Sequence, residues 1–396
     1  MFDTPLNERR PRVDWLLIAA LVGLMLISVT FIASAKPPVE GIAWHRQLYV
    51  KQIIWFALGL GVAAAVGVLD YRALTRWSFI GYWMVVLLLV TVLFFGTVRF
   101  GARRWFDLGF FSLQPSEFAK LALIFAQAHF LSRPTEELRR PAVFLKGLGL
   151  TFLPFVLILK EPDLGSALVL LPISLVMMFV AGVPLRFLAR LLGGMGCLVV
   201  LLLVDILFAP PSWQIKLEDY QRRRLLVYFG RDFAADKRSP AERERAWKQQ
   251  RDDSWNVRQA LISVGSGGLW GRGWREGQQI ALGYLPPMVS HNDFIFSVIA
   301  EEKGFLGSVV VLSLYAVVLF CGIRIAGQAR DRLGKLLAVG VVALLFSHVF
   351  INIGMNIRLM PVTGIPLPLL SYGGSSVLCS LIAAGVLQNV YRYRNS

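Results

Sequence analysis

The stretch WLLIAALVGLMLISVTFIASA, residues 15–35, decides what kind of fold this chain adopts. It contains no charged side chain over its whole length. A helix rises about 1.5 Å per residue, so about 20 apolar residues cross the roughly 30 Å of bilayer hydrocarbon. The run follows a basic segment, ERRPRVDW, and is longer than the apolar region of a cleaved signal peptide. It therefore predicts a membrane-spanning helix rather than a cleavable signal.

Similar apolar runs recur along the chain. Hydrophobic residues make up 56% of the 396, and charged residues only 17%, against about a quarter charged in soluble proteins. We predict an all-α, polytopic membrane protein, residues 1–396 forming one integral membrane domain. The predicted spans number about ten, at residues 15–35, 51–69, 79–97, 115–131, 143–160, 164–182, 187–208, 305–323, 335–356 and 367–390.

The net charge of +16 is explained by lysine and arginine at the ends of membrane helices, so we expect no nucleic-acid partner. Basic residues of the short connecting segments gather on the side that carries both termini. By the positive-inside rule both termini are predicted to be cytoplasmic. The three cysteines lie in apolar runs and are odd in number, so no disulfide framework is expected.

Residues 209–304 separate the seventh and eighth predicted spans and form a large loop outside the cytoplasm. Residues 231–254 are charged and poorly patterned, which is typical of a mobile surface segment. The part that follows is rich in glycine and aromatic residues. Tryptophan and tyrosine favour the headgroup layer, and glycine allows tight turns or the close approach of a ligand.

Near the end of this loop stands HNDFIFSVIAEE, residues 291–302. Asp293 precedes an apolar run and is predicted to lie at the outer membrane interface. Two interpretations remain open. Either Asn292 or Asp293 caps the following helix, or Asp293 takes part in chemistry. The run itself is predicted to be a short surface helix or an extension of the eighth span.

Two further polar groups fall on the same outer side. In GARRWFDLGFFSLQPSEFAK, residues 101–120, Arg103 and Arg104 lie near the headgroups. Glu117 and Lys120 share one face of the fourth span. They form either an internal ion pair or part of a functional cavity, since charges inside spans are costly. Residues 352–376 read as a re-entrant loop, functional or architectural.

These patterns leave two classes of protein open. A transporter is expected to carry charges deep in its spans and broken helices in matching halves. Here the unusual polar residues gather toward the outer surface, which favours an enzyme acting on a membrane-held substrate. The four histidines are scattered without ligand spacing, so no protein-built metal site is predicted.

Several long motifs, in order along nearly the whole chain, resemble the shape, elongation, division and sporulation (SEDS) family. They are GARRWFDLG with QPSEFAK (101–120), EPDLGSAL (161–168), DYQRRRLL (219–226), QALISVGSGGLWGRGW (259–274), LPPMVSHNDFIFSVIAEEKGFLG (285–307) and PVTGIPLPLLSYGGSS (361–376). The PVTGIPLP form is similar to the rod-elongation branch rather than the division branch. Glu161 stands where glutamine is usual, Asn292 where threonine is usual, and the stretch 231–254 is longer than typical.

The resemblance implies a peptidoglycan glycosyltransferase of the bacterial cytoplasmic (inner) membrane that polymerises glycan strands from lipid II for cell elongation and rod shape. The family's essential aspartate falls on Asp293, and its polar cavity pair on Glu117 and Lys120. A sugar hydroxyl needs a base, whereas a diphosphate leaves as a stable anion that needs only positive charge nearby. We therefore expect Asp293 to be the catalytic base, Arg103, Arg104 or Lys120 to hold the diphosphate, and the anomeric configuration to invert.

The same resemblance implies partners. A class B penicillin-binding protein, a transpeptidase, would crosslink the strands, alongside other membrane proteins of the elongation complex. A divalent cation, Mg²⁺ or Mn²⁺, is the alternative source of positive charge at the diphosphate. A lipid II flippase, a division-branch polymerase and a scaffold remain the rival functions.

Overall fold

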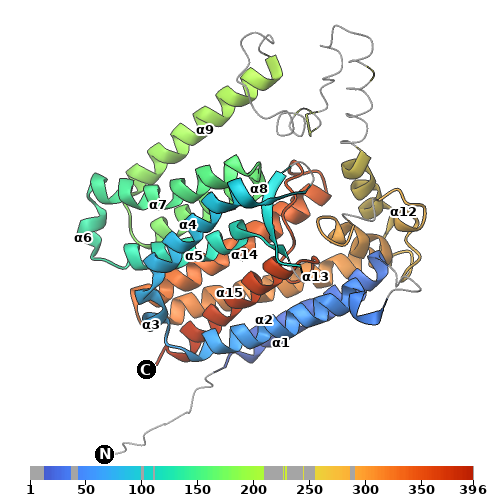
Figure 1. The fold of residues 1–396 in the computed structure, drawn as a ribbon, viewed down its shortest axis with the longest axis horizontal. Coiled ribbons are helices and arrows are strands. Elements are labelled where there is room, and N and C mark those ends of the chain that lie inside the picture. Colours follow the sequence, from blue (N-terminus) through green and yellow to red (C-terminus); the bar gives the residue numbers. More distant parts are fainter. Residues whose placement is uncertain are drawn as a thin grey trace, which may run out of the picture.

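The computed structural model describes residues 13–36, 43–99, 102–109, 112–208, 255–285 and 290–395, together with Leu226, Tyr228, Phe229 and Glu244. Most of the described chain is helical, and the long helices lie alongside one another in a bundle (Figure 1). The elements in chain order are α1 (Trp15–Ala35), a 3-10 turn (Trp44–Arg46), α2 (Leu48–Val68), α3 (Tyr71–Arg76), α4 (Ser78–Phe95), β1 (Thr97–Arg99), β2 (Ala102–Asp107), β3 (Ser112–Leu113), α5 (Pro115–Leu131), α6 (Thr135–Leu138), α7 (Pro141–Lys160), α8 (Leu164–Val180), α9 (Leu185–Phe208), α12 (Gln278–Ala281), α13 (Ile295–Gln328), α14 (Arg332–Asn356) and α15 (Gly374–Arg392).

Eight helices within the described ranges are long and apolar enough to cross a membrane. They are α1, α2, α4, α7, α9, α13, α14 and α15. Helices α5 and α8 have 17 residues each and pack against α14 within the same bundle. Together these ten helices fall on the ten predicted segments, so the polytopic all-α fold is confirmed.

Two predicted boundaries were wrong. The eighth span does not begin at residue 305, because α13 starts at Ile295 and continues across a kink at Gly304 (φ 65°, ψ −158°). Both interpretations of this run are thus partly correct: residues 295–302 form a helix that leads into the span. The tenth span begins at Gly374 rather than residue 367, because the prolines at 366 and 368 disfavour helix in the preceding segment.

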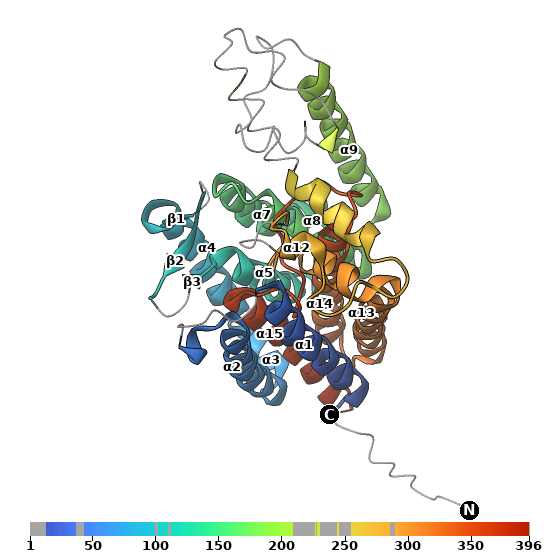
Figure 2. The same ribbon diagram turned by 90° about the vertical axis from the view of Figure 1, so that its right-hand side faces the viewer.

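The bundle has a centre and an edge. Helices α14 and α15 are 72% buried over their apolar windows, whereas α9 is 11% buried. Figures 1 and 2 both show α9 projecting from the bundle. Small residues allow close packing at the centre: a Cβ on Gly340 would meet Ile124 at 2.7 Å, and one on Gly385 would meet the Ala63 carbonyl at 2.7 Å. Membrane helices associate through such small-residue contacts.

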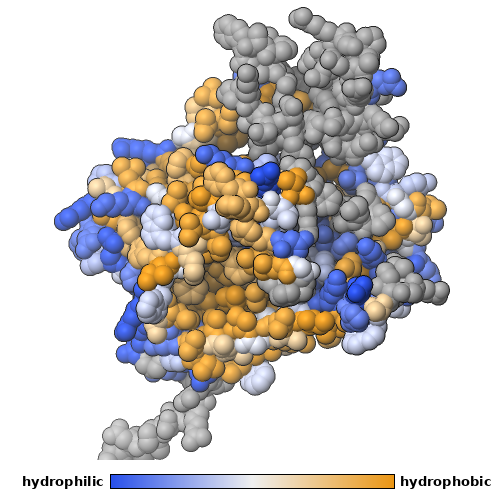
Figure 3. All heavy atoms as spheres, viewed as in Figure 1, coloured by the Kyte–Doolittle hydropathy of each residue, from blue (hydrophilic) through white to orange (hydrophobic). Residues whose placement is uncertain are grey.

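Both termini lie at the same end of the bundle. The Asp14 N–H donates to Gln388 Oε1 (3.0 Å), and Gln388 Nε2 donates to the Asp14 carbonyl (2.9 Å). At the far end of α1, Ser34 donates to Glu302 near the start of α13. The space-filling view shows a hydrophobic belt across the bundle with hydrophilic residues gathered toward both ends (Figure 3). These features fit a membrane-spanning orientation with both termini on one side.

The connection between α4 and α5 holds three short strands that the sequence did not predict. β1 pairs antiparallel with β2, where Val98 lies opposite Arg103, and β2 pairs with β3, where Phe106 lies opposite Leu113. The strands bring Arg103 and Arg104 to the end of the bundle opposite the termini, beside the start of α5.

Candidate active site

The start of α13 forms the centre of the candidate site. The N-cap of α13 is Phe294, without a side-chain cap bond. Neither Asn292 nor Asp293 therefore occupies the N-cap position, and capping of the helix by the Asp293 carboxylate stays a prediction. Asp293 lies one residue earlier, in a turn formed by residues 290–293, and its side chain is half-buried.

Side-chain amides of α14 hold this turn by its backbone. Asn352 Nδ2 and Asn356 Nδ2 donate to the Asp293 carbonyl at 3.0 and 3.2 Å. The Asn356 Oδ1 in turn accepts from the Ser297 hydroxyl at 2.6 Å. Both asparagines are fully buried, where an amide without a partner would be costly. The backbone on which the Asp293 carboxylate is mounted is thus fixed from a neighbouring helix.

The segment 361–373 enters the bundle between α14 and α15 and closes the other side of the turn. The Ser371 hydroxyl donates to the Asn292 carbonyl (2.5 Å), and the Tyr372 N–H donates to the His291 carbonyl (2.9 Å). Gly364 has φ +73°, and a Cβ added there would lie 3.6 Å from Asp293 Oδ2. The Asp293 carboxylate therefore faces the backbone of this segment.

Irregular backbone at membrane depth is tolerated where protein groups satisfy its hydrogen bonds, and 361–373 fits that rule. Ser28 donates to the Leu370 carbonyl (2.9 Å), Gln52 to the Ser371 carbonyl (3.3 Å) and Tyr315 to the Pro368 carbonyl (2.5 Å). The re-entrant loop predicted from the sequence is confirmed as a buried irregular segment.

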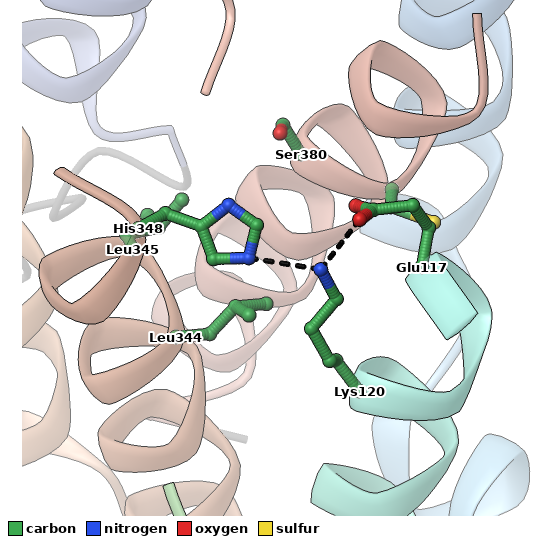
Figure 4. A pocket seen from close by; sticks show the side chains of 7 residues that line it. Glu117, Lys120, Leu344, Leu345, His348 and Ser380 are labelled. Carbon is green, nitrogen blue, oxygen red and sulfur yellow. Dashed lines mark hydrogen bonds and ion pairs between the residues drawn. The ribbon is translucent and has the colours of Figure 1, made fainter. Parts of the chain in front are cut away.

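Glu117 and Lys120 form a second, fully buried polar group (Figure 4). Lys120 Nζ lies 2.6 Å from Glu117 Oε1 and 2.9 Å from His348 Nε2. These side chains, with Leu344, Leu345, Cys379 and Ser380, line a cavity of about 10 Å³, close to the space one water molecule needs. The internal ion pair that the sequence left as one alternative is present in the structure.

Arg104 and Arg103 have different surroundings. Arg104 Nε donates to the Glu161 carbonyl (3.0 Å) and its Nη2 to the Pro162 carbonyl (2.6 Å), while Nη1 lies 3.8 Å from Asp163 Oδ1. Arg104 therefore braces the connection between α7 and α8. Arg103 is exposed, and its Nη1 donates to the Phe94 carbonyl at 3.3 Å.

Glu161 is fully buried, and both its carboxyl oxygens lack a hydrogen-bond partner. Burial raises the pKa of its carboxyl to about 9, and the Asp163 charge adds to the rise while Arg104 opposes it. The group is therefore protonated at neutral pH. This position resembles a family glutamine, and a protonated glutamate is the closest acidic equivalent of that amide.

Two glycines of the outer loop, Gly267 and Gly271, closely approach the backbone of α13. Residues 267–274 follow a helix at 255–266 and pack against the kink of α13. A Cβ on Gly267 or Gly271 would overlap the Ala300 or Glu302 carbonyl, and one on Gly304 would lie 2.7 Å from the Leu269 carbonyl. The glycines of this motif thus allow its backbone to pack directly against the backbone of α13 near the kink. The charged stretch 231–254 lies outside the described residues except for Glu244, as does nearly all of DYQRRRLL.

Of the predicted site residues, Arg104 is connected to the segment that faces Asp293 only indirectly, through the start of α8. Arg104 lies beside Asp163 at the N-cap of α8, and two residues later a Cβ on Gly165 would lie 2.8 Å from the Thr363 carbonyl of the re-entrant segment. Sequence reasoning missed Ser371 as a support of the turn, and it set His348 aside with the other histidines. The available signal was the spacing of His348, Asn352 and Asn356, four residues apart on one face of an apolar helix.

No cluster of three or more His, Cys, Asp or Glu that could hold a metal ion occurs among the residues that the structure describes. Mg²⁺ is commonly held by one or two carboxylates together with substrate phosphates. A divalent cation in this part of the chain would therefore need ligands beyond these side chains.

Fold and site together define a class of protein. It is a polytopic membrane protein in which an aspartate-bearing turn, held by side chains of a neighbouring helix, lies at the end of the bundle opposite the termini. The chain belongs to the FtsW/RodA/SpoVE family of cell cycle proteins, whose family model matches residues 13–396.

Curated relatives match the chain over almost its whole length. Peptidoglycan glycosyltransferase RodA of Treponema pallidum is 34% identical, covering 95% of this chain and 97% of the relative. Peptidoglycan glycosyltransferase MrdB of Escherichia coli K12 is 32% identical, covering 100% and 98%. Stage V sporulation protein E of Bacillus subtilis is 36% identical, covering 98% and 99%.

Solved structures agree with the fold. A chain of a peptidoglycan synthase complex that coordinates polymerization and crosslinking has a TM-score of 0.75 at 30% identity, covering 97% of this chain and 99% of that one. The rod shape determining protein RodA of Thermus thermophilus has a TM-score of 0.67 at 30% identity, covering 97% and 98%.

Proposed function

We propose that this chain is a peptidoglycan glycosyltransferase that polymerises glycan strands from lipid II. The observation that carries the proposal is the placement of Asp293. Its backbone is held by Asn352 and Asn356, and its carboxylate faces the re-entrant segment at Gly364. The likeness to relatives named peptidoglycan glycosyltransferases, along nearly the full length, supports it.

In the proposed reaction the Asp293 carboxylate takes the proton of the acceptor 4-hydroxyl on the N-acetylglucosamine of lipid II. The hydroxyl oxygen attacks the anomeric carbon of the growing strand. The bond from that carbon to the diphosphate oxygen breaks, and undecaprenyl diphosphate leaves with the electron pair. Because this is one displacement, the anomeric configuration inverts. General-base help of this kind is worth about 10²–10⁴ in rate.

The departing diphosphate needs positive charge. We assign that role to Arg103 and Arg104, which lie at the same end of the bundle as Asp293; Arg103 is the exposed member of the pair. The substrate-binding role predicted for Glu117 and Lys120 stays a prediction, and their burial against each other favours an internal ion pair. Dependence of the rate on added Mg²⁺ or Mn²⁺, measured after chelation, tests whether a divalent cation joins the arginines.

Within the family we propose the rod-elongation branch. The first relatives named above are RodA and MrdB, and PVTGIPLP is the form that resembles that branch. Restoration of rod shape to a host depleted of its own elongation polymerase tests this assignment. Restoration of division instead would place the chain in the other branch.

We further propose that the chain lies in the bacterial cytoplasmic membrane with both termini in the cytoplasm. The bias of lysine and arginine toward the terminal end supports this orientation. Asp293 then faces the outer leaflet, where lipid II presents its sugars. A fluorescent protein that matures only in the cytoplasm, fused after residue 396, should fluoresce.

A class B penicillin-binding protein is the proposed partner, together with other membrane proteins of the elongation complex. The similar chain in a peptidoglycan synthase complex supports this. Co-purification of the two membrane proteins, and a higher polymerisation rate with the partner present, would test it.

The deciding experiment uses purified protein, with and without the partner, in liposomes that contain lipid II. We expect long glycan strands, resolved by gel electrophoresis and digestible by a muramidase. Movement of intact lipid II between leaflets without polymer would support the flippase alternative instead. Neither polymer nor movement, from protein that is folded and bound to its partner, would contradict both.

A further inference from the structure

One face of α14 carries a row of three polar side chains. His348, Asn352 and Asn356 are spaced four residues apart, so they follow one another along the helix. All three are buried. The stripe begins at the Glu117–Lys120 pair and ends at the turn that bears Asp293.

The two partners of His348 fix its proton. Lys120, paired with Glu117, can only donate, so His348 Nε2 accepts from it at 2.9 Å. The Pro366 carbonyl can only accept, so Nδ1–H donates to it at 3.2 Å. His348 is therefore a neutral imidazole that joins the buried cation to the re-entrant segment.

Asn352, the next polar side chain along α14, holds the residue before Pro366. Asn352 Nδ2 donates both to the Ile365 carbonyl (2.7 Å) and to the Asp293 carbonyl (3.0 Å). Adjacent carbonyls at 365 and 366 are thus gripped by Asn352 and His348. Gly364, which faces the Asp293 carboxylate, directly precedes them.

We propose that His348 is a positioning residue for glycosyl transfer: it transmits the fixed location of the buried Lys120 to the segment that faces Asp293. The inference rests on the proposed function for its catalytic readout. The ion pair is then an anchor for the site rather than a subsite. A buried ion pair adds little net stability. Here its role would instead be to hold His348, and through His348 the re-entrant segment, in one position.

Amide substitutions separate the two contacts of His348. His348→Gln can accept from Lys120 and donate toward Pro366 together. His348→Asn is one carbon shorter and reaches only the position of Nδ1, so it keeps only the contact to Pro366. His348→Leu keeps neither. We expect kcat to fall in the order wild type, Gln, Asn, Leu, with Gln within about threefold of wild type and Leu lower by about tenfold or more. KM should stay within about twofold, because no substrate contact is removed.

Tyr315→Phe is the matched control, because it removes another hydrogen bond to the same segment, at Pro368, without touching Lys120 or His348. Its kcat should remain near wild type. Hydrogen exchange at residues 290–294 and 361–366 provides a readout that does not need activity. Exchange there should rise in His348→Asn and stay unchanged in His348→Gln.

Wild-type kcat and exchange in His348→Asn would overturn the proposal, because the link to Lys120 would then be dispensable. So would equal losses in His348→Asn and Tyr315→Phe. If His348→Leu does not fold, the Asn and Gln pair still decides. If the wild type forms no polymer, the proposed function fails, while the exchange readout still tests the link.

Discussion

Helices α14 and α13 both begin shortly after an aspartate, but the aspartate has a different position in each. At the start of α14, Asp331 is the N-cap: its carboxylate accepts from the Gly334 N–H (2.8 Å) and from Arg72 Nε (3.0 Å). At the start of α13, Asp293 precedes the N-cap, and its backbone carbonyl is held by side chains of α14. Asp331 thus occupies the cap position of its helix, whereas Asp293 lies one residue before the cap position of its own.

Three further helices also begin at an aspartate. Asp14, Asp70 and Asp163 are N-caps of α1, α3 and α8, and each accepts a backbone N–H from the first turn. Capping is therefore the ordinary use of aspartate in this chain. An aspartate positioned by neighbouring amides is the exception, as expected where a site rather than a fold sets the requirement.

The largest effect is expected from Asp293→Asn. The amide keeps the size of the side chain and the backbone clamp but cannot take a proton. We expect kcat for polymerisation to fall by about 10³-fold while KM for lipid II changes little. Steady-state kinetics with labelled lipid II measure both.

Asp107→Asn is the control for that substitution, because Asp107 is exposed on β2 at the same end of the bundle. It should keep wild-type kcat. An equal loss in both variants would show that removing any carboxylate at this end impairs the enzyme, and Asp293 would then have no special role.

The second effect concerns how the α13 start is held. A Cβ at Gly271 would overlap the Glu302 carbonyl, and Gly271 has φ +87°. Gly271→Ala should therefore destabilise the protein by about 3 kcal/mol. The thermal midpoint of the detergent-solubilised protein measures the loss. Gly265→Ala, where nothing lies within 4 Å of the added Cβ, should not lower it.

The third effect is a pH dependence at the start of α8. The folded pKa of Glu161, about 9, lies above the ordinary glutamate pKa of 4.5, so the folded state holds the extra proton. The contribution of this group is fully present below pH 4.5 and is lost as pH rises toward 9. Glu161→Gln should remove that loss and stabilise the protein by about 2 kcal/mol at pH 8.

Thermal midpoints of wild type and Glu161→Gln across pH 5–8.5 check this slope. The two proteins should be similar at pH 5 and diverge as pH rises. Parallel curves would show that Glu161 does not titrate in this window.

The smallest effect is expected from Asp331→Asn, at the capping aspartate of α14. Asparagine is also a good N-cap, so Asp331→Asn should lose only the half-exposed ion pair with Arg72, worth about 0.5 kcal/mol. Burial acts to raise the pKa of Asp331, but bonds from Gly334, Arg72 and Tyr71 outweigh it and hold that pKa below its usual value. The ion pair therefore contributes above the ordinary aspartate pKa and is lost in acid. A small fall in thermal midpoint at pH 7, which shrinks as the pH is lowered below the ordinary aspartate pKa, is the expected result.

The fold could be predicted from the sequence because bilayer thickness imposes one length on every span. The ten apolar runs fell on ten helices for that reason. The start of α15 was missed because LPLLSY is as apolar as a span, while buried partners such as Ser28 and Tyr315 satisfy its irregular backbone. Apolar content alone does not distinguish the two.

The site was predictable only in its outline. Asp293, Glu117 and Lys120 drew attention as charged residues in apolar surroundings. The turn around Asp293 is held by residues about 60 positions away in the chain, and such contacts leave no local pattern. Only the four-residue spacing of the α14 stripe was visible beforehand.

The most direct measurement is glycan polymer formed from lipid II by Asp293→Asn and Asp331→Asn, assayed side by side and normalised to folded protein. We expect almost no polymer from Asp293→Asn and an amount within about twofold of wild type from Asp331→Asn. Wild-type amounts of polymer from Asp293→Asn would contradict the assignment of Asp293 as the catalytic base, because its carboxylate would then have no part in the reaction.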